Sequence, residues 1–295
     1  YIAADSIDAD YGKGVGVAKH AKLVFHGVPV LYTPWADFPL NGNRKSGLLV
    51  PTVKIGSNGT EINQPYYFNL APNYDATLTP GIISARGVQL GGEFRYLQPR
   101  YRGEIGGKWM PDDRHSRHNN RYTARWQHFQ NFGKGFTGSI DFNQVSDDDY
   151  YRDFYNRTDI ARNVNLNREA RLDYKTDVLG EWLEANLKVQ KYQTLANADG
   201  YKNEPYAILP RLSGSWQKNF AGNLFSLSGQ YTRFAHDSKQ AGQRFVLYPS
   251  LSRNIHNDWG YIRPKVGLHY THYILDGFQG KSGRTTGRSI PIANI

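Results

Sequence analysis

The sequence predicts an all-β protein with one long antiparallel sheet, and two observations support this prediction. The first is alternation: in residues 136–143 and 183–190, apolar and polar side chains follow one another. Because successive side chains on a strand point to opposite faces, such a sheet has one apolar and one polar face. The second is that the expected connections alternate between short and long. Together they predict an outer-membrane antiparallel β-barrel, of which this chain would form a part.

The composition is compatible with that fold. Among 295 residues, 39% are hydrophobic and 14% aromatic, with 30 glycines and 21 tyrosines. This low apolar content is unfavourable for a packed interior, but it is compatible with a barrel that has a polar inside and aromatic girdles. A secreted β-sandwich would share this composition, so composition alone leaves both folds open. Since no run approaches the roughly 18 apolar residues of a membrane helix, a spanning chain would need a closed barrel.

The charge and the absence of cysteine limit the partners and the covalent chemistry. The net charge of +10 suggests an anionic partner: nucleic acid, anionic lipid headgroups or a phosphorylated glycolipid. The basic residues are scattered and no nucleic-acid motif is present, so we expect no nucleic-acid partner. No disulfide can form within these residues, because the chain has no cysteine.

The N-terminal segment is predicted to belong to a different part of the protein. Short strands are expected at 2–10 and 14–26, followed by a proline-punctuated segment at 28–34. This pattern is typical of the edge of a soluble β-domain that leads into a linker, and Pro34 and Pro39 suit a boundary.

We therefore expect two parts, residues 1–40 and residues 41–295. No signal peptide is visible at Tyr1, and residues 290–295 still have strand character. We accordingly expect the chain to be a fragment cut at both ends, and a half-barrel with two open edges is not expected to fold alone.

The barrel part is predicted to contain about fourteen strands, most of about 10 to 15 residues, where a tilted transmembrane strand needs roughly 9 to 11. The expected strands lie near 46–56, 61–72, 75–85, 88–98, 101–111, 121–131, 135–146, 163–175, 179–193, 206–218, 223–235, 243–254, 259–273 and from 288 onward.

The expected connections set the orientation. Short connections are expected at 99–100, 132–134, 176–178, 219–222 and 255–258, and long ones at 112–120, 147–162, 194–205, 236–242 and 274–287. In outer-membrane barrels the short turns are periplasmic and the long loops extracellular. By parity, the N-terminal segment would enter from the periplasm.

The first two barrel strands contain an unusual pair of prolines. Asn58-Gly59 predicts a tight hairpin turn, and Pro51 and Pro65 lie almost symmetrically about it. Proline donates no hydrogen bond to the sheet and is confined to edges or irregular positions. The pair, with nearby Gly47, predicts either a weak seam or prolines merely tolerated near strand ends. Spacing alone leaves both interpretations open.

The alternation also predicts which charged side chains face the barrel lumen. These are expected to hydrate the lumen and contact a plug, while selective phosphate binding is a second hypothesis. The expected lumen-facing residues are Glu93, Arg95, Arg171, Asp173, Glu184 and Lys188.

Other candidate sites carry weaker signals. His115 and His118 could bind a metal, but a solvated extracellular loop explains them better. The aspartates at 147–149 lack the spacing of a calcium loop, so we expect a solvated turn there. The glycosylation sequon at 58–60 is better explained as the hairpin turn. We therefore expect no metal site, no cofactor and no catalytic residue.

Several stretches resemble the LptD family of outer-membrane lipopolysaccharide-assembly proteins. The resemblance is specific up to Leu97 and weak beyond Phe154. It rests on Gly27-Val28-Pro29-Val30-Leu31-Tyr32, Arg44-Lys45-Ser46-Gly47-Leu48-Leu49-Val50-Pro51, Pro65-Tyr66-Tyr67-Phe68-Asn69-Leu70-Ala71-Pro72-Asn73, Asp75-Ala76-Thr77-Leu78-Thr79-Pro80, Arg86-Gly87, Glu93-Phe94-Arg95-Tyr96-Leu97, and Val145-Ser146-Asp147 with Tyr150, Asp153 and Phe154.

The resemblance implies a periplasmic β-jelly-roll, of which residues 1–40 would be the end, and a large barrel in the outer membrane of Gram-negative bacteria. It implies lipopolysaccharide as the substrate, an LptE-like lipoprotein as the plug and an LptA-like protein as the periplasmic bridge. In the family, prolines in the first two strands weaken pairing with the last strand, and Pro51 and Pro65 match them. This implies a lateral gate. A passive porin or an outer-membrane lipase or protease would be the alternatives.

Overall fold

The computed structural model describes residues 1–25, 27–42, 44–154, 164–178, 181–197 and 199–295. The chain forms two compact units. The first comprises Tyr1–Gln98, Gly103–Ala124 and Val145–Asp153, and the second Pro99–Arg102, Arg125–Gln144 and Phe154–Ile295. Across the described ranges the elements are strands, apart from one short helix, α1 (Tyr150–Phe154). Within those same residues, no helix has the length and apolarity needed to cross a membrane.

A small antiparallel sheet at the N-terminus belongs to the first unit. Strands β1 (Ile2–Ala3) and β2 (Ser6–Asp10) pair with β3 (Val15–Phe25), which also pairs with β4 (Val28–Pro39). Strand β4 is the edge of this sheet, a position that tolerates its prolines because edge N–H groups need no partner.

This sheet agrees with the expected strands in part. The strand expected at 2–10 is divided into β1 and β2, and His26 lies outside the described residues. The proline-punctuated segment 28–34 is strand and continues to Pro39, so a linker can begin only after it. A domain boundary between residues 40 and 41 remains a prediction, since the first compact unit contains residues from both sides of it.

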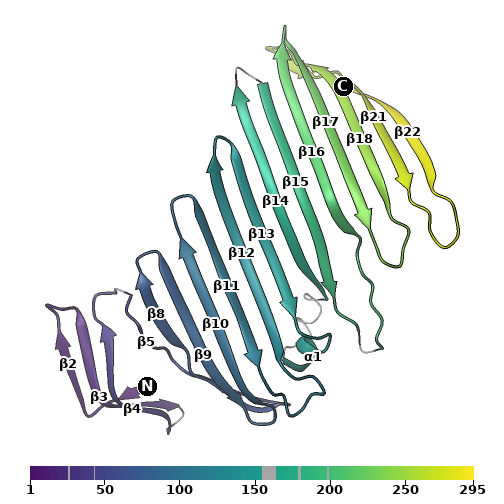
Figure 1. Cartoon of the computed structure of the whole chain (residues 1–295). Coiled ribbons are helices and arrows are strands. Elements are labelled where there is room, and N and C mark those ends of the chain that lie inside the picture. Colours follow the sequence, from purple (N-terminus) through teal and green to yellow (C-terminus); the bar gives the residue numbers. More distant parts are fainter. Residues whose placement is uncertain (26, 43, 155–163, 179–180, 198) are drawn as a thin grey trace. The chain divides into compact units, whose positions relative to one another are not determined.

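The large antiparallel sheet contains sixteen strands among the described residues. Their order across the sheet follows their order in the chain (Figure 1). They are β5 (Gly47–Leu48), β6 (Thr52–Gly56), β7 (Gly59–Asn63), β8 (Tyr66–Ala71), β9 (Tyr74–Ile83), β10 (Gly87–Leu97), β11 (Tyr101–Met110), β12 (Arg121–Gly133), β13 (Phe136–Val145), β14 (Asn165–Val178), β15 (Glu181–Thr194), β16 (Ala207–Phe220), β17 (Asn223–Ala235), β18 (Gly242–Arg253), β21 (Lys265–Leu275) and β22 (Arg284–Asn294).

Most of the expected strands are confirmed, with three differences. The first two are each divided into two pieces, as described below. The short turn expected at 255–258 is wrong, because a small hairpin, β19 (Ile255–Asn257) and β20 (Gly260–Ile262), precedes β21. The short turn expected at 176–178 is wrong, because strand β14 continues to Val178. Residues 179–180, and residues 155–162 of an expected long connection, lie outside the described residues.

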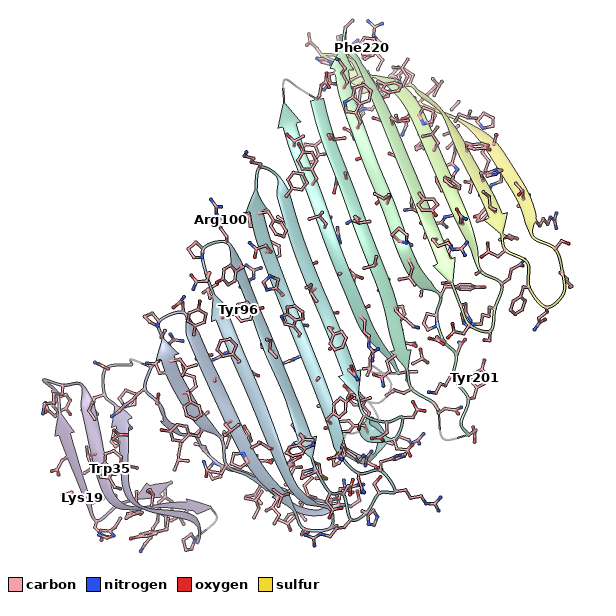
Figure 2. All side chains as sticks on the ribbon, viewed as in Figure 1. Lys19, Trp35, Tyr96, Arg100, Tyr201 and Phe220 are labelled. Atoms are coloured by element: carbon pink, nitrogen blue, oxygen red, sulfur yellow. The ribbon has the colours of Figure 1, made fainter. Side chains whose placement is uncertain are left out.

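The sheet has two chemically different faces, which confirms the alternation. In the register of β14 and β15, Leu172 lies opposite Leu187, whereas Arg171 lies opposite Lys188. Opposed residues share a face, so one face is apolar and the other charged. Side chains project from both faces (Figure 2). Leu187 remains 39% exposed, so the apolar face is not covered by the rest of the described chain.

Short and long connections lie at opposite ends of the strands in the second unit. Phe220 precedes the short turn between β16 and β17, and Tyr201 lies in the long connection between β15 and β16. Figure 2 labels both residues, at the two opposite ends of these strands. The alternation of short and long connections is therefore a property of the folded sheet as far as β18, and the connection from β18 to β21, which contains β19 and β20, departs from it.

Candidate functional site: a broken first hairpin and its anchors

The first hairpin, residues 47–71 in strands β5 to β8, is interrupted at its prolines. Strand β5 pairs with β8 through Gly47–Tyr67 and Leu48–Tyr66, and Leu49 N–H still donates to the Pro65 carbonyl at 2.9 Å. Pairing resumes between β6 and β7 at Thr52–Asn63. The first strand thus spans the interruption with two residues, 50 and 51, against one on the second strand.

Two residues against one constitute a β-bulge, which disrupts the ladder and shifts the register by one residue. Pro51 lies within it and Pro65 directly beside it. Proline has no N–H to donate, so regular pairing would form the fewest ladder hydrogen bonds at this position along the two strands. The structure therefore places both prolines at one break in the first hairpin.

The break affects only the outermost strand. On the other side of the second strand, Asn63 pairs with Gly81 and Tyr66 with Leu78, in one unchanged register across Pro65. The backbone N–H of Gln64 donates to the Pro80 carbonyl at 3.0 Å, which keeps the second strand attached to β9. The hairpin is consequently weakest between its own two strands.

The side chain of Gln64 bridges the break. Its Nε2 donates to the Leu49 carbonyl at 2.8 Å and to the Pro65 carbonyl at 3.1 Å. The contact to Leu49 joins the two strands where the backbone ladder is disrupted. This side-chain hydrogen bond thereby compensates in part for the backbone hydrogen bonds that the bulge removes.

Gly47 lies in β5, next to the break. A Cβ atom built at this position would meet no atom within 4 Å. Packing therefore does not require glycine here, and its contribution to a weak seam would be backbone freedom alone.

One end of the hairpin is anchored by Asp75. Its carboxylate accepts hydrogen bonds from Arg95 Nε at 2.7 Å, from Arg44 Nη1 at 2.9 Å and from the Tyr67 hydroxyl at 3.1 Å. Arg44 Nη2 also donates to the Pro72 carbonyl at 2.5 Å, in the turn between β8 and β9. The segment that precedes β5 is thus tied to β8, β9 and β10 through one carboxylate.

Near the other end lies a cluster of five charged residues, which we call the loop clamp: Arg86, Asp113, Arg121, Asp147 and Asp153. The Arg121 side chain is fully buried and contacts Asp113 at 2.9 Å, Asp153 at 2.5 Å and Asp147 at 2.7 Å. Arg86 contacts Asp113 at 2.7 Å. The clamp joins the connections after β11 and β13 to the turn between β9 and β10 and to the start of β12.

The electrostatics of the clamp favour its charged form. Burial alone would raise the pKa of Asp113, but hydrogen bonds from Arg121, the His115 N–H and Arg86 hold that pKa below its ordinary value. Burial opposes ionisation of Asp147 too, yet hydrogen bonds from Arg121 and Ser146 lower its pKa. Breaking a buried, hydrogen-bonded set of charges costs far more than breaking an exposed ion pair.

The clamp reaches the turn of the first hairpin through Asn58. The Asn58 Nδ2 donates to the main-chain carbonyl of Asp153 at 2.5 Å. Gly59 has φ of +83° and pairs with Gly56, so the two residues of the tight turn are Ser57 and Asn58; Asn58 does not have the positive φ that the type I′ turn expected for Asn58-Gly59 requires. A hairpin turn is therefore present, and the side-chain amide of the sequon asparagine donates a hydrogen bond to α1.

The predicted lumen-facing residues lie on the charged face. In the first unit, Arg95 is opposite Asp75, and Glu93 lies 3.7 Å from Arg95. In the second unit, Arg171 contacts Asp173 at 2.8 Å.

The remaining two predicted residues also make cross-strand ion pairs on that face, Glu184 with Lys175 at 2.9 Å and Lys188 with Glu169 at 3.2 Å. That this charged face is the one turned to a lumen remains a prediction.

The weaker candidates fall into ordinary structural roles. The main-chain N–H groups of His115 and His118 donate to Asp113 and Ser116, as in turns, and no group of metal-ligating side chains occurs in the part of the chain that the structure describes. The solvated turn expected for 147–149 is wrong for Asp147, whose side chain is buried against Arg121.

Sequence analysis missed the loop clamp and the role of Asp75. The available signal was the position of lone arginines and aspartates at strand ends beside long connections. That signal does not specify partners, because the connections bring the carboxylates together only once they are folded.

Sequential antiparallel strands, two unlike faces and alternating connections define the class of outer-membrane β-barrel proteins. Residues 119–295 match the family model described as LptD: LPS transport system D, and the chain belongs to this family. It is similar over its whole length to the LPS-assembly protein LptD of Neisseria gonorrhoeae, at 57% identity, and that of Nitrosomonas eutropha, at 37%. The corresponding protein of Chromobacterium violaceum is 49% identical over 99% of the chain.

The chain spans 37% of the length of the Neisseria and Chromobacterium relatives and 41% of the Nitrosomonas relative. The predicted family membership is confirmed. The family match covers residues 119–295, which include the part beyond Phe154 where the sequence motifs are weakest.

Proposed function

We propose that this chain is part of a lipopolysaccharide transporter in the outer membrane of Gram-negative bacteria. Lipopolysaccharide would reach the outer leaflet through a lateral gate, a barrel wall that opens between the first and last strands. The observation that carries the proposal is the bulged and proline-interrupted first hairpin, at the barrel edge that such a gate would use. The protein would be a transporter and not an enzyme, and would need no cofactor.

The orientation follows from the connections. The short turns would be periplasmic and the long connections extracellular. Residues 1–40 would then be the end of a periplasmic β-jelly-roll, and residues 41–295 the first part of the barrel. An LptA-like bridge protein would supply the lipopolysaccharide, and an LptE-like lipoprotein would plug the barrel.

The two faces of the sheet suit opposite surroundings. The exposed apolar side chains, Leu172 and Leu187 among them, would contact lipid. The charged face would line the lumen, with cross-strand ion pairs that hold it together while it contacts water and the plug. The residues in that role are those predicted from the sequence, Glu93, Arg95, Arg171, Asp173, Glu184 and Lys188.

The substrate explains why a gate is needed. Lipopolysaccharide carries several acyl chains beneath a large anionic sugar head. Moving one chain of about a dozen carbons into water costs on the order of 10 kcal/mol, at ~0.8 kcal/mol per methylene. The acyl chains must therefore stay in apolar surroundings while the head passes through a polar lumen, which requires a wall that opens towards lipid.

The first hairpin suits that role because it is inexpensive to open. Each ladder hydrogen bond contributes roughly 1 kcal/mol of net stability. Pro51 and Pro65 supply no N–H, and the bulge disrupts the ladder beside them. A passive porin would be expected to have unbroken first strands, so the broken hairpin disfavours that alternative.

The proposal is tested by locking the seam. In the full-length protein, a disulfide would join the strand of residue 51 to the final strand, and lipopolysaccharide delivery to the cell surface would be measured with and without reductant. A control disulfide would join Ala170 and Val189, which face each other on β14 and β15. We expect the seam lock to abolish delivery and the control to leave it unchanged. Undiminished delivery with the seam locked would rule out the gate.

A further inference from the structure

The outer turn of the first hairpin has a contact that its own strands do not provide. Asn58 donates to the Asp153 carbonyl, 95 residues away in the chain. Asp153 is the fourth residue of α1, and its carboxylate binds Arg121 at 2.5 Å. The turn is therefore connected to the loop clamp through one residue, whose main chain and side chain each make a contact.

The clamp is a rigid point of attachment. Arg121 donates Nε and Nη2 to the two oxygens of Asp147, at 3.0 and 2.7 Å, a bidentate pair with fixed geometry. Its Nη1 contacts both Asp113 and Asp153. Because Arg121 and Asp113 are inaccessible to solvent, water cannot replace these contacts without large rearrangement.

The opposite end of the hairpin is also fixed, through Asp75, Arg44 and Arg95. The hairpin is thus held at both ends by buried or partly buried charges and broken between them. A strained structure deforms first where the fewest contacts must be lost, and here that is the bulge at Pro51 and Pro65.

We propose that Arg121 is a positioning residue which, through Asp153, holds the outer turn of the first hairpin in place. The seam then yields at the prolines while its outer end keeps its alignment with the final strand. This inference rests on the proposed function, since it concerns how the proposed gate deforms. Arg121 lies far from the break in the chain and is linked to the first hairpin through α1 and Asn58.

The first test measures coupling between the clamp and the turn by hydrogen exchange in the full-length protein with its plug lipoprotein. Arg121→Met should accelerate exchange of the amides at 57–60 by about tenfold or more, because they lose a fixed partner. Asn58→Asp keeps a residue that favours the turn but removes the amide donor. It should accelerate exchange at 150–154, on the far side of the contact.

Arg117→Met is the matched control, since Arg117 is an exposed arginine in the same connection as Asp113. It should leave both segments unchanged. The amides of β14 and β15 report whether each variant is folded. If exchange at 57–60 is unaltered in a folded Arg121→Met protein, or exchange at 150–154 is unaltered in Asn58→Asp, the positioning role is refuted.

The second test separates this inference from the gate itself. A cysteine pair that joins the strand of residue 51 to the final strand should oxidise roughly tenfold more slowly in the Asn58→Asp background, because a loosened hairpin lowers the effective concentration of the two thiols. An unchanged rate would overturn the inference. If the lock forms in the parent protein and delivery continues, the proposed function fails, whatever the oxidation rates.

Discussion

The first hairpin and the pair β14–β15 follow the same antiparallel rules with opposite results. Every residue from Asn165 to Val178 pairs with a residue of β15, from Thr194 to Glu181, without a shift. The first hairpin has only two short paired stretches, with a bulge and two prolines between them. The difference lies in the one extra residue of the bulge and in the two N–H groups that the prolines lack, which occur at the same position along the hairpin.

The two regions also differ in what joins their strands. Ion pairs such as Lys188–Glu169 cross between β14 and β15 in the middle of the strands. In the first hairpin, the side chain of Gln64 crosses the break, and the opposed charges Lys54 and Glu61 lie beyond it, between the break and the turn. A sheet can thus be weakened locally while its ends stay fixed, which is what a wall that opens and closes again requires.

The largest expected effect tests the regular pair. Leu187→Arg places a charge on the apolar face of β15 and should destabilise the membrane-embedded full-length protein by about 2–4 kcal/mol, if this face contacts lipid. Ser215→Arg is the control, because Ser215 lies opposite Glu184 on the charged face. Denaturant unfolding in lipid vesicles measures both. Equal costs for the two substitutions would contradict the assignment of the faces.

The second prediction concerns a double variant that makes the first hairpin more like the pair β14–β15. Pro51→Ala together with Pro65→Ala restores two N–H groups, each contributing about 1 kcal/mol. Exchange in β5 to β8 should slow by roughly fivefold to thirtyfold, and lipopolysaccharide delivery should slow with it. Pro29→Ala, on the edge strand β4, should alter neither. Delivery at the parent rate despite slower exchange would separate the prolines from transport.

The third prediction increases the difference. Gln64→Leu removes the side-chain hydrogen bond to the Leu49 carbonyl. It should therefore lower the stability of the attachment between the two strands at the break by about 1 kcal/mol. Exchange at residues 52–56 should then accelerate severalfold. Gln217→Leu, an exposed position on β16, is the control. No change at 52–56 would mean that Gln64 does not bridge the seam in the membrane.

The smallest effect concerns pH. The pKa values of Asp113 and Asp147 are lowered in the folded protein, so the stability they contribute is fully present above their unfolded pKa of about 3.9. It is lost as the pH falls through the lower, folded values. A spin label at residue 117 should keep its mobility from about pH 8 to pH 5 and loosen only below about pH 4. Loosening near pH 6 would implicate a different group, such as a histidine.

The strands and their two faces could be predicted because alternation is local. The apolar–polar pattern at 183–190 specifies strand β15 and its faces without knowledge of its neighbours. The positions of Pro51 and Pro65 likewise indicated a common height. The bulge could not be predicted, because a shift of one residue is a property of the pairing and not of either strand.

The anchors were beyond sequence analysis for a related reason. Asp113, Asp147 and Asp153 come from two different connections and meet only at Arg121. Nothing in the local sequence distinguishes such aspartates from solvated turn residues, and the solvated turn was accordingly the wrong expectation for Asp147. The hairpin β19–β20 was missed because strands of 3 residues carry too little alternation to separate strand from turn.

Hydrogen exchange in the full-length protein with its plug, in lipid vesicles, tests the central claim most directly. The claim is that the first hairpin is a preformed weak seam, in contrast to the pair β14–β15, whose register is unbroken. Amides at 47–56 should exchange at least about a hundredfold faster than those at 168–175, because local opening at the break costs far less than opening β14–β15. Equal protection of the two segments would contradict the account.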